Sequence, residues 1–256
     1  MDLKAGFSAT PPRLGALQEF SSSTESCVRT RVMDHLESHL HTAGRIANVV
    51  AHEVMPYLGS HPMVHCHAHG PSEQFPYYTF VTEGLSVHRM PVPAAVIEDW
   101  GVEAQDDCAH VEFVVYARKA DVEGEVANGS DLTLTEPAKL VRHFAHTVQE
   151  HNVWVWSGHT MLFTVGELTN VVLVPVREID SAASAPGSFG VIPAAGGAPR
   201  VTFFALVPLT AEEMCFKRSQ GGLKALLPFI GDAATNPSKS IPFYVDFQRS
   251  SAQLSG

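Results

Sequence analysis

The sequence predicts a single α+β domain built on one mixed, mostly antiparallel β-sheet with helices packed against it. Residues 75–83 and 201–207 are short runs of aromatic and β-branched residues, which is the composition of buried strands. The expected order is one helix, three strands, one helix, two strands and two short helices. Because strands and helices do not alternate regularly, the order argues against a doubly wound parallel sheet. At 256 residues the chain is long enough to bury a large core.

The N-terminal part divides into a tail and a helix. Residues 1–29 contain SATPP and SSSTES and show little periodicity, which predicts a mobile tail. From residue 30 to Val54, apolar residues recur at spacings of three and four, so we expect one helix that Pro56 and Gly59 end. We expect the domain to cover residues 30–232 and a C-terminal extension to follow at 233–256.

Two strands and a sharp corner are expected next. Residues 61–70 alternate three histidines with small apolar residues, a period of two that predicts a strand with one apolar face. The strand at 75–83 follows after a Gly-Pro-Ser turn, so we expect the two to pair. Gly84 then allows a tight turn at no Cβ cost, and we expect its φ to be positive.

The middle of the chain predicts one more strand and one more helix. Residues 94–107 are acidic and irregular, 109–117 are expected to form a strand, and 121–133 a polar loop. The helix at 135–150 begins with Thr135, a suitable N-cap, and has a proline in its first turn.

In the C-terminal half, two strands flank a long loop. We expect an aromatic segment at 153–160 that ends in a glycine corner, and strands at 168–176 and 201–207. The segment between these strands, 181–199, is rich in glycine, proline and alanine, and loops of this length are usually functional or disordered. Two short helices should follow, the first with a capping box of Thr210 and Glu213. Residues 241–247 could add an edge strand.

Composition limits the kinds of partner. The net charge is −10 and the pI near 5.7, which argues against nucleic acid or an anionic membrane and would suit a basic protein partner. No apolar run approaches the ~18 residues that span a bilayer, and the N-terminus lacks the apolar segment of a signal peptide. The four cysteines are far apart in the sequence, which favours a reducing, cytosolic setting; they are Cys27, Cys66, Cys108 and Cys215.

The histidines at 65, 67 and 69 are the strongest candidate for a metal site. Imidazole is a good zinc ligand, but residues two apart on a strand are separated by ~6.5–7 Å, so three cannot reach one ion without bending. Two can, with help from elsewhere. Since no HExxH or similar pattern supports them, we expect no metal and no cofactor. The alternative is a metal-dependent hydrolase that uses His65, His67 and either His110 or His159.

Other reactive residues have simpler explanations, and we expect no catalytic residue. Ser86 follows Gly84 as in a nucleophile elbow, but His88 replaces the second glycine, so we expect a turn serine that bonds to backbone. The sequence 157–160, SGHT, is expected to be a glycine corner. Cys108 and Cys215 are expected to be core thiols. The acidic pairs at 106–107 and 212–213 should lie in a loop and a helix start.

Four motifs in order resemble the suppressor of fused (SUFU) domain family. They are YYTFVTEGLSVHRMPVP at 77–93, HVEFVVYA at 110–117, VWVWSGHT at 153–160 and VTFFALVPLTAEEMCFK at 201–217. The resemblance implies a SUFU-like α+β fold and a protein-binding role without catalysis. Vertebrate members clamp a short peptide of a transcription factor as an added strand, and bacterial members have been proposed as immunity proteins. Since 26 residues follow Ile230, we expect the single-domain form.

The resemblance and the residues together suggest where a partner would bind. We expect an exposed sheet edge and the 181–199 loop to be the binding surfaces, with Phe189 and Ile192 as the apolar anchors of that loop. The partner would be a protein or peptide. The resemblance also marks a set of turn residues from the family motifs: Gly84, Ser86, Trp156, Gly158, His159 and Pro208.

Overall fold

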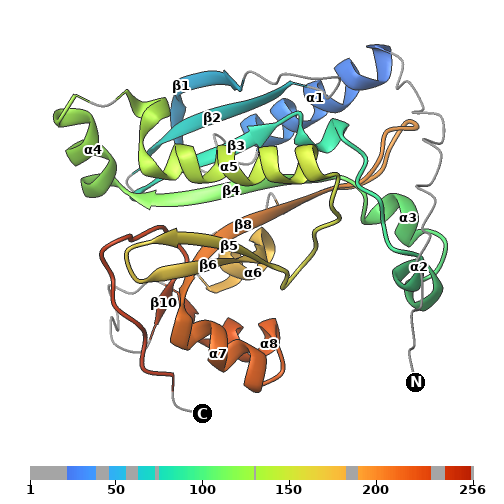
Figure 1. Cartoon of the computed structure of the whole chain (residues 1–256). Helices are drawn as coiled ribbons and strands as arrows, with labels where there is room; N and C mark the ends of the chain where they lie inside the picture. The colour runs from blue at the N-terminus through green and yellow to red at the C-terminus, as the bar shows by residue number, and fades with distance from the viewer. Residues whose placement is uncertain are drawn as a thin grey trace, which may run out of the picture.

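The core of the molecule is an eight-stranded sheet in the order β1-β2-β3-β4-β8-β6-β5, with β7 paired to β8 (Figure 1). A computed structural model describes residues 22–38, 46–55, 63–72, 75–129, 131–182, 190–231 and 240–254. The strands are β1 Ile46–Met55, β2 Val64–Pro71, β3 Tyr77–Glu83, β4 Val111–Arg118, β5 Thr160–Val165, β6 Leu168–Pro175, β7 Val191–Ile192 and β8 Val201–Thr210.

The sheet is mixed, as predicted. Neighbouring strands are antiparallel except for the central pair β4 and β8, which run parallel. Two further strands, β9 (Ile230–Gly231) and β10 (Ile241–Pro242), form a separate parallel pair. The main sheet therefore ends in β1 on one side and β5 on the other.

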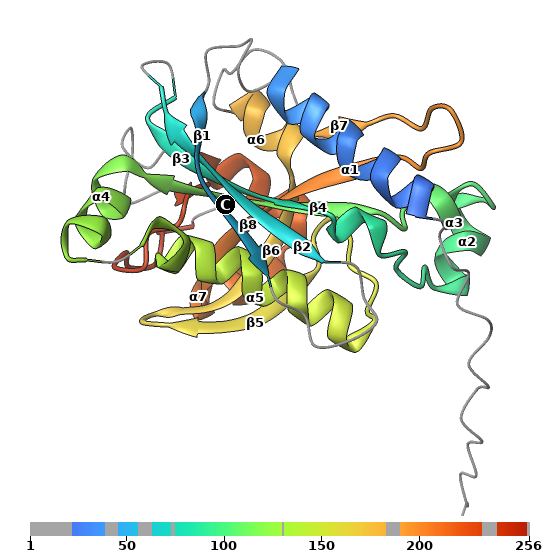
Figure 2. The ribbon, with the colours of Figure 1, turned by 90° about the horizontal axis from the view of Figure 1, so that it is seen from above.

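Helices cover both faces of the sheet. Viewed from above, α1 (Ser22–Leu36) and α6 (Val176–Ala182) lie on one face and α5 (Glu136–His151) on the opposite face (Figure 2). The remaining helices are α2 Ala94–Trp100, η2 Leu85–Val87, α3 Ala104–Asp107, α4 Lys119–Ala127, η3 Leu132–Leu134, α7 Ala211–Ser219, α8 Leu223–Leu226 and η4 Leu227–Phe229. Among the described residues, no helix has the length and apolarity needed to cross a bilayer.

The two faces of the sheet bury two separate hydrophobic cores. Residues alternate across a strand, so Phe203 packs into one core and Phe204 into the other. We call them the α1-side core, which contains Val32 and Leu36, and the α5-side core, which contains Phe144. Every residue of β8 is buried because the strand lies between both cores.

The prediction of one long N-terminal helix at 30–54 is wrong. The helix ends at Leu36, and residues 46–55 form β1, which pairs with β2. The sequence IANVVAHEVM is rich in β-branched residues, and pairing with a neighbouring strand outweighed its helical spacing. Residues 22–29, expected in the tail, form the first half of α1, with Val28 buried one turn before Val32. The domain limits themselves stay a prediction.

Two segments expected to be irregular are helical. Residues 94–107 hold α2 and α3, and residues 121–133 overlap α4 and η3. These helices are short and bury few side chains, so no periodic apolar stripe marks them in the sequence. β5 was not predicted either, although Gly166, with φ of 58°, marks the turn to β6.

The predictions for α5, β8 and α7 are confirmed. The buried face of α5 includes Leu140, Val141, Phe144 and Val148. α7 begins with the capping box of Thr210 and Glu213. Thr135 precedes α5, but its hydroxyl donates to the Leu132 carbonyl instead of capping the helix. Residues 241–247 contribute β10 and, through Val245, a bridge to the end of β4.

Candidate functional site

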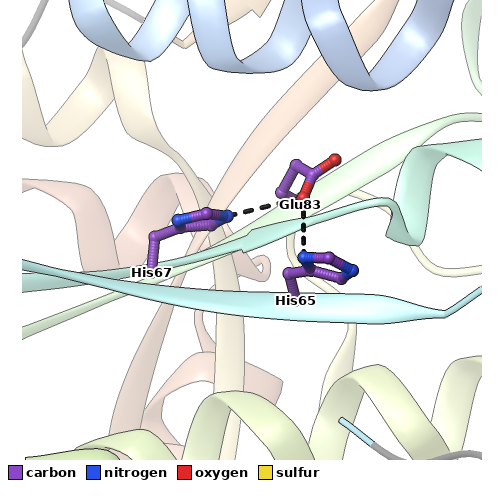
Figure 3. Close-up of side chains that lie close together, drawn as sticks. All are labelled: His65, His67 and Glu83. Atoms are coloured by element: carbon purple, nitrogen blue, oxygen red, sulfur yellow. Dashed lines mark hydrogen bonds and ion pairs between the residues drawn. The ribbon is translucent and has the colours of Figure 1, made fainter. Parts of the chain in front are cut away.

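Two of the three neighbouring histidines form a cluster with a glutamate from the next strand. β2 and β3 are antiparallel, and their register places His65 opposite Glu83. Glu83 Oε2 lies 3.3 Å from His65 Nδ1 and 3.4 Å from His67 Nε2 (Figure 3). The three ligand atoms all lie within 4.8 Å of one another. Glu83 was not predicted because the spacing of histidines in one strand does not give the register of the next.

The other carboxylate oxygen of Glu83 faces a cation. Arg29 on α1 approaches Glu83 Oε1 with Nη1 at 3.2 Å and also bonds to Glu25 and the Met63 carbonyl. Burial acts to raise the pKa of Glu83, but the hydrogen bond with His67 and the charges of Arg29 and His65 outweigh it, so the pKa is lowered. The cluster thus has an ionised carboxylate between two imidazoles and a guanidinium.

The third histidine expected for a hydrolase is not part of this cluster. His110 is buried, and its Nδ1 lies 2.7 Å from the Ser86 carbonyl oxygen; burial lowers its pKa. His159 lies in the corner before β5, where its Nδ1 accepts a hydrogen bond from the Trp156 amide at 3.2 Å. Within the described residues, the group that could hold a metal is His65, His67 and Glu83.

The corner after β3 is fixed by a buried carboxylate, Glu112 of β4. Its Oε1 accepts hydrogen bonds from the Gly84 amide at 3.0 Å and from both the amide and the hydroxyl of Ser86, at 3.0 and 2.6 Å. Its Oε2 accepts from Thr82 Oγ1 at 2.5 Å. Ser86 therefore bonds to a side chain and not to backbone acceptors, which corrects the expectation. A lone acid inside an apolar strand was the signal in the sequence.

Gly84 has the positive φ predicted for it, 99°. A Cβ at this position would lie 2.3 Å from Arg29 Nη1 and 2.7 Å from the Met63 carbonyl oxygen. Any side chain here would therefore disturb both the corner and the cation that faces Glu83.

The second corner, before β5, is built from tryptophans. Trp154 and Trp156 stack with centroids 6.3 Å apart, and Trp154 Nε1 donates to the Cys108 carbonyl at 3.1 Å. Gly158 has φ of 79°, and a Cβ on it would meet Leu223 at 3.1 Å. Since Cys108 leads directly into the strand that holds Glu112, both corners are attached to the start of β4.

The remaining candidates are structural or exposed. Cys108 is buried, as expected, whereas Cys215 is exposed, which contradicts a core position. Burial and the neighbouring Asp107 raise the pKa of the Cys108 thiol. Glu213 is fully buried and pairs through both oxygens with Arg249 at 2.6 Å, a contact that the sequence did not predict. The Pro208 carbonyl accepts from Arg249 at 2.8 Å.

The structure tests one of the two residues proposed as apolar anchors of the 181–199 segment. Ile192 is buried in β7, with 5% of its surface exposed, so the expected exposed anchor is wrong at this position. Phe189 lies outside the described residues. The segment had no periodic pattern that would have revealed β7, because a two-residue strand is too short to show one.

The edge formed by β5 exposes apolar surface. β5 pairs with β6 on one side and is the last strand in the order. Leu162 is 82% exposed and Thr164 is also exposed, whereas Phe163 packs against Phe144 and Phe247. One side of β5 is therefore anchored to the α5-side core, and the other faces solvent.

A cavity of about 540 Å³ lies near the start of β8 and is lined in part by charged side chains. Its lining includes Arg177, Arg200 and Lys224, together with Glu178 and the ring of Trp156. Two of these cations already face a carboxylate: Arg177 pairs with Glu178 at 3.4 Å and Arg200 with Asp107 at 3.8 Å.

Comparison with known proteins gives one family match. The model of the family "Suppressor of fused protein (SUFU)" matches residues 60–247, well over half of the chain. Among curated proteins, none matches.

Chains of several solved structures also match. A chain of the Sufu-Fu complex crystal structure has a TM-score of 0.55 and 13% identity, and the match covers 88% of this chain and 91% of that one. A SUFU homolog from Neisseria gonorrhoeae FA 1090 has a TM-score of 0.47 and 14% identity. The match covers 90% of this chain and 100% of that one. At such low identity the first likeness shows that the fold is SUFU-like and nothing more.

Proposed function

Because this chain belongs to the suppressor of fused family, we propose that it is a non-enzymatic protein-binding module that sequesters or neutralises a protein partner. A structural relative was crystallised as a Sufu-Fu complex, which supports a protein partner. The four cysteines are free thiols, which fits a reducing compartment such as the cytosol.

The free edge of β5 is the observation that carries this proposal. Edge strands present unpaired backbone groups, and natural proteins usually protect them with lysine, proline or a covering element. β5 has the sequence TMLFTV, with neither lysine nor proline, and Leu162 in it is 82% exposed. An extended segment of a partner can add to such an edge through main-chain hydrogen bonds, while pockets for alternate side chains give specificity.

The expected partner segment is extended and has an apolar residue that meets Leu162. The net charge of −10 favours basic residues around that segment, because opposite charges speed the encounter of two proteins. The role as a regulator or as an immunity protein depends on which partner is bound, so identifying the partner decides between them.

The test compares capture of a partner by two matched variants. Leu162→Lys with Thr164→Lys places the charges that protect natural edges on β5, and both positions are exposed, so folding should be retained. Val102→Lys, at an apolar residue that is 73% exposed in another part of the chain, is the control.

Native cell extract is passed over each immobilised variant, and the captured proteins are identified by mass spectrometry. We expect one protein to be retained by the wild type and the Val102 variant and lost by the β5 variant. With that protein purified, the amides of β5 should exchange hydrogen more slowly in the complex. Equal capture by the β5 variant would overturn the edge as the binding surface.

A further inference from the structure

The cluster on β2 and β3 has the geometry of a metal site with three protein ligands. We propose that His65, His67 and Glu83 bind a zinc-class divalent cation, with the fourth coordination position open. This inference is independent of partner binding at β5, because the cluster lies near the other edge of the sheet, beneath α1 (Figures 1 and 3).

The two histidines overcome their spacing along the strand by using different ring nitrogens. His65 presents Nδ1 and His67 presents Nε2 to the same carboxylate oxygen, Glu83 Oε2. The ring centroids remain 6.2 Å apart and the rings are nearly parallel, yet the ligand atoms converge within 4.8 Å. The register of β2 with β3 has no shift, so the nitrogens converge on a regular strand, and any separation wider than about 3.3–3.4 Å has to close when the ion binds.

The two histidine–glutamate distances are compatible with a metal site as well as with hydrogen bonds. An N–H···O bond is usually about 2.9–3.0 Å long, whereas the two histidine–glutamate distances are 3.3 and 3.4 Å. Ligand atoms of a tetrahedral zinc with bonds of 2.0–2.1 Å are about 3.3–3.4 Å apart, which follows from the bond lengths. Both histidine–glutamate distances match an edge of this tetrahedron, and the separation of the two imidazole nitrogens is within 4.8 Å.

The donor set selects the class of ion. Two imidazoles and one carboxylate are the ligands of many zinc sites with an open position, whereas Ca²⁺ and Mg²⁺ prefer oxygen alone. Burial helps to arrange the ligands in advance: the side chains of His67 and Glu83 are 9% and 6% exposed. His65 is 22% exposed, which leaves a path to solvent.

The positive charge of Arg29 disfavours binding of a metal cation to Glu83. A variant without this charge therefore tests whether the cluster binds a metal. The Arg29 guanidinium forms an ion pair with Glu83 Oε1, with Nη1 at 3.2 Å, so the metal would bind to Oε2. A positive charge this close repels Zn²⁺, so its removal should tighten binding by about 10-fold or more. Arg31 lies on the same helix but bonds to the carbonyls of Pro193 and Pro199, so Arg31→Gln is a matched control.

The experiment titrates Zn²⁺ into the chelator-treated full chain by isothermal calorimetry. We expect one ion per chain, and each of His65→Ala, His67→Ala and Glu83→Gln should weaken binding by more than the roughly 10- to 100-fold cost of losing an outer-shell partner. His151→Ala, at an exposed histidine of α5, should leave the affinity unchanged. Arg29→Gln should bind more tightly than Arg31→Gln.

A second measurement does not depend on the ligand variants folding. Co²⁺ replaces Zn²⁺ in such sites, and its visible absorption distinguishes a four-coordinate site from an octahedral one. We expect a four-coordinate spectrum from the wild-type chain. The site would be overturned if neither the wild type nor the Arg29 variant bound Zn²⁺, or if the His65 and His67 variants bound it as tightly as the wild type.

Discussion

At the scale of single residues, one buried carboxylate explains the shape of the first corner. Glu112 is fully buried and receives hydrogen bonds from Thr82, from Gly84 and twice from Ser86. The two amides belong to the turn, where helical or sheet partners are lacking, so the carboxylate satisfies donors that would otherwise be buried without acceptors. The turn and the strand β4 are thereby joined.

This carboxylate should make stability depend on pH near neutrality. Burial raises the pKa of Glu112 to about 7 from 4.5, against the opposing hydrogen bonds from Ser86 and Thr82. Because the folded-state value is the higher one, the stabilising contribution is complete below pH 4.5 and is lost as the pH rises through about 7. The loss amounts to up to about 3 kcal/mol of unfolding free energy.

Urea denaturation of the wild type and Glu112→Gln between pH 5 and pH 8 measures this effect, because the difference between the two proteins removes the contribution of other groups. We expect the stability advantage of the wild type to shrink as the pH rises. An advantage that grows with pH would show that the four donors lower the pKa of the folded state instead.

Part of the candidate site could be predicted from the sequence, and part could not. The alternation of His65 and His67 placed them on one side of a strand, and the positive φ of Gly84 followed from the composition of its turn. Glu83 and Arg29 could not be added, because their contact with the histidines depends on strand register and on where α1 packs. Both are set by tertiary contacts and not by local spacing.

At the scale of elements, strongly patterned segments were predicted and weakly patterned ones were not. α5 is confirmed because its buried residues recur with the helical period, and β8 because it is a continuous run of apolar residues rich in β-branched and aromatic side chains. β1 was missed because IANVVAHEVM suits both a helix and a strand, and pairing with β2 decides between them. The two-residue strand β7 carries no pattern of its own.

The start of α7 is held to the C-terminal segment by one buried ion pair. Glu213 closes the capping box with Thr210 and also binds Arg249 and the Ala252 amide. The side chain of Glu213 is 0% exposed and that of Arg249 is 9% exposed. A residue in the last ten of the chain thus completes the end of β8 and the first turn of α7.

Removal of this pair should cost far more than removal of its neighbour. Glu213→Ala leaves the guanidinium of Arg249 with carbonyl acceptors but with no carboxylate to balance its charge, and we expect a loss of about 3–5 kcal/mol. Glu212→Ala, at the exposed residue beside it, should change stability by less than about 0.5 kcal/mol. Urea denaturation measures both. A loss below 1 kcal/mol for Glu213→Ala would mean that the C-terminal segment contributes little to the fold.

At the scale of the whole molecule, the sheet joins two cores that do not share side chains. Phe203 belongs to the α1-side core and Phe204 to the α5-side core, one residue apart on β8. Trp154 and Trp156 both pack against the α5-side core, so most of the tryptophan fluorescence should report on that face. A substitution that destabilises one core can therefore destabilise the other core only through the strands that both cores share.

We therefore expect the molecule to unfold as one cooperative unit. Phe203→Ala should destabilise by about 3–5 kcal/mol, and it should lower the urea midpoint of tryptophan fluorescence as much as Phe204→Ala does, although Phe203 faces away from Trp156. The midpoints from fluorescence and from far-UV circular dichroism should coincide for each protein. A Phe203 variant whose circular dichroism transition moves while its fluorescence transition stays would show that the two faces unfold separately. The single predicted domain would then consist of two stability units joined by β4 and β8.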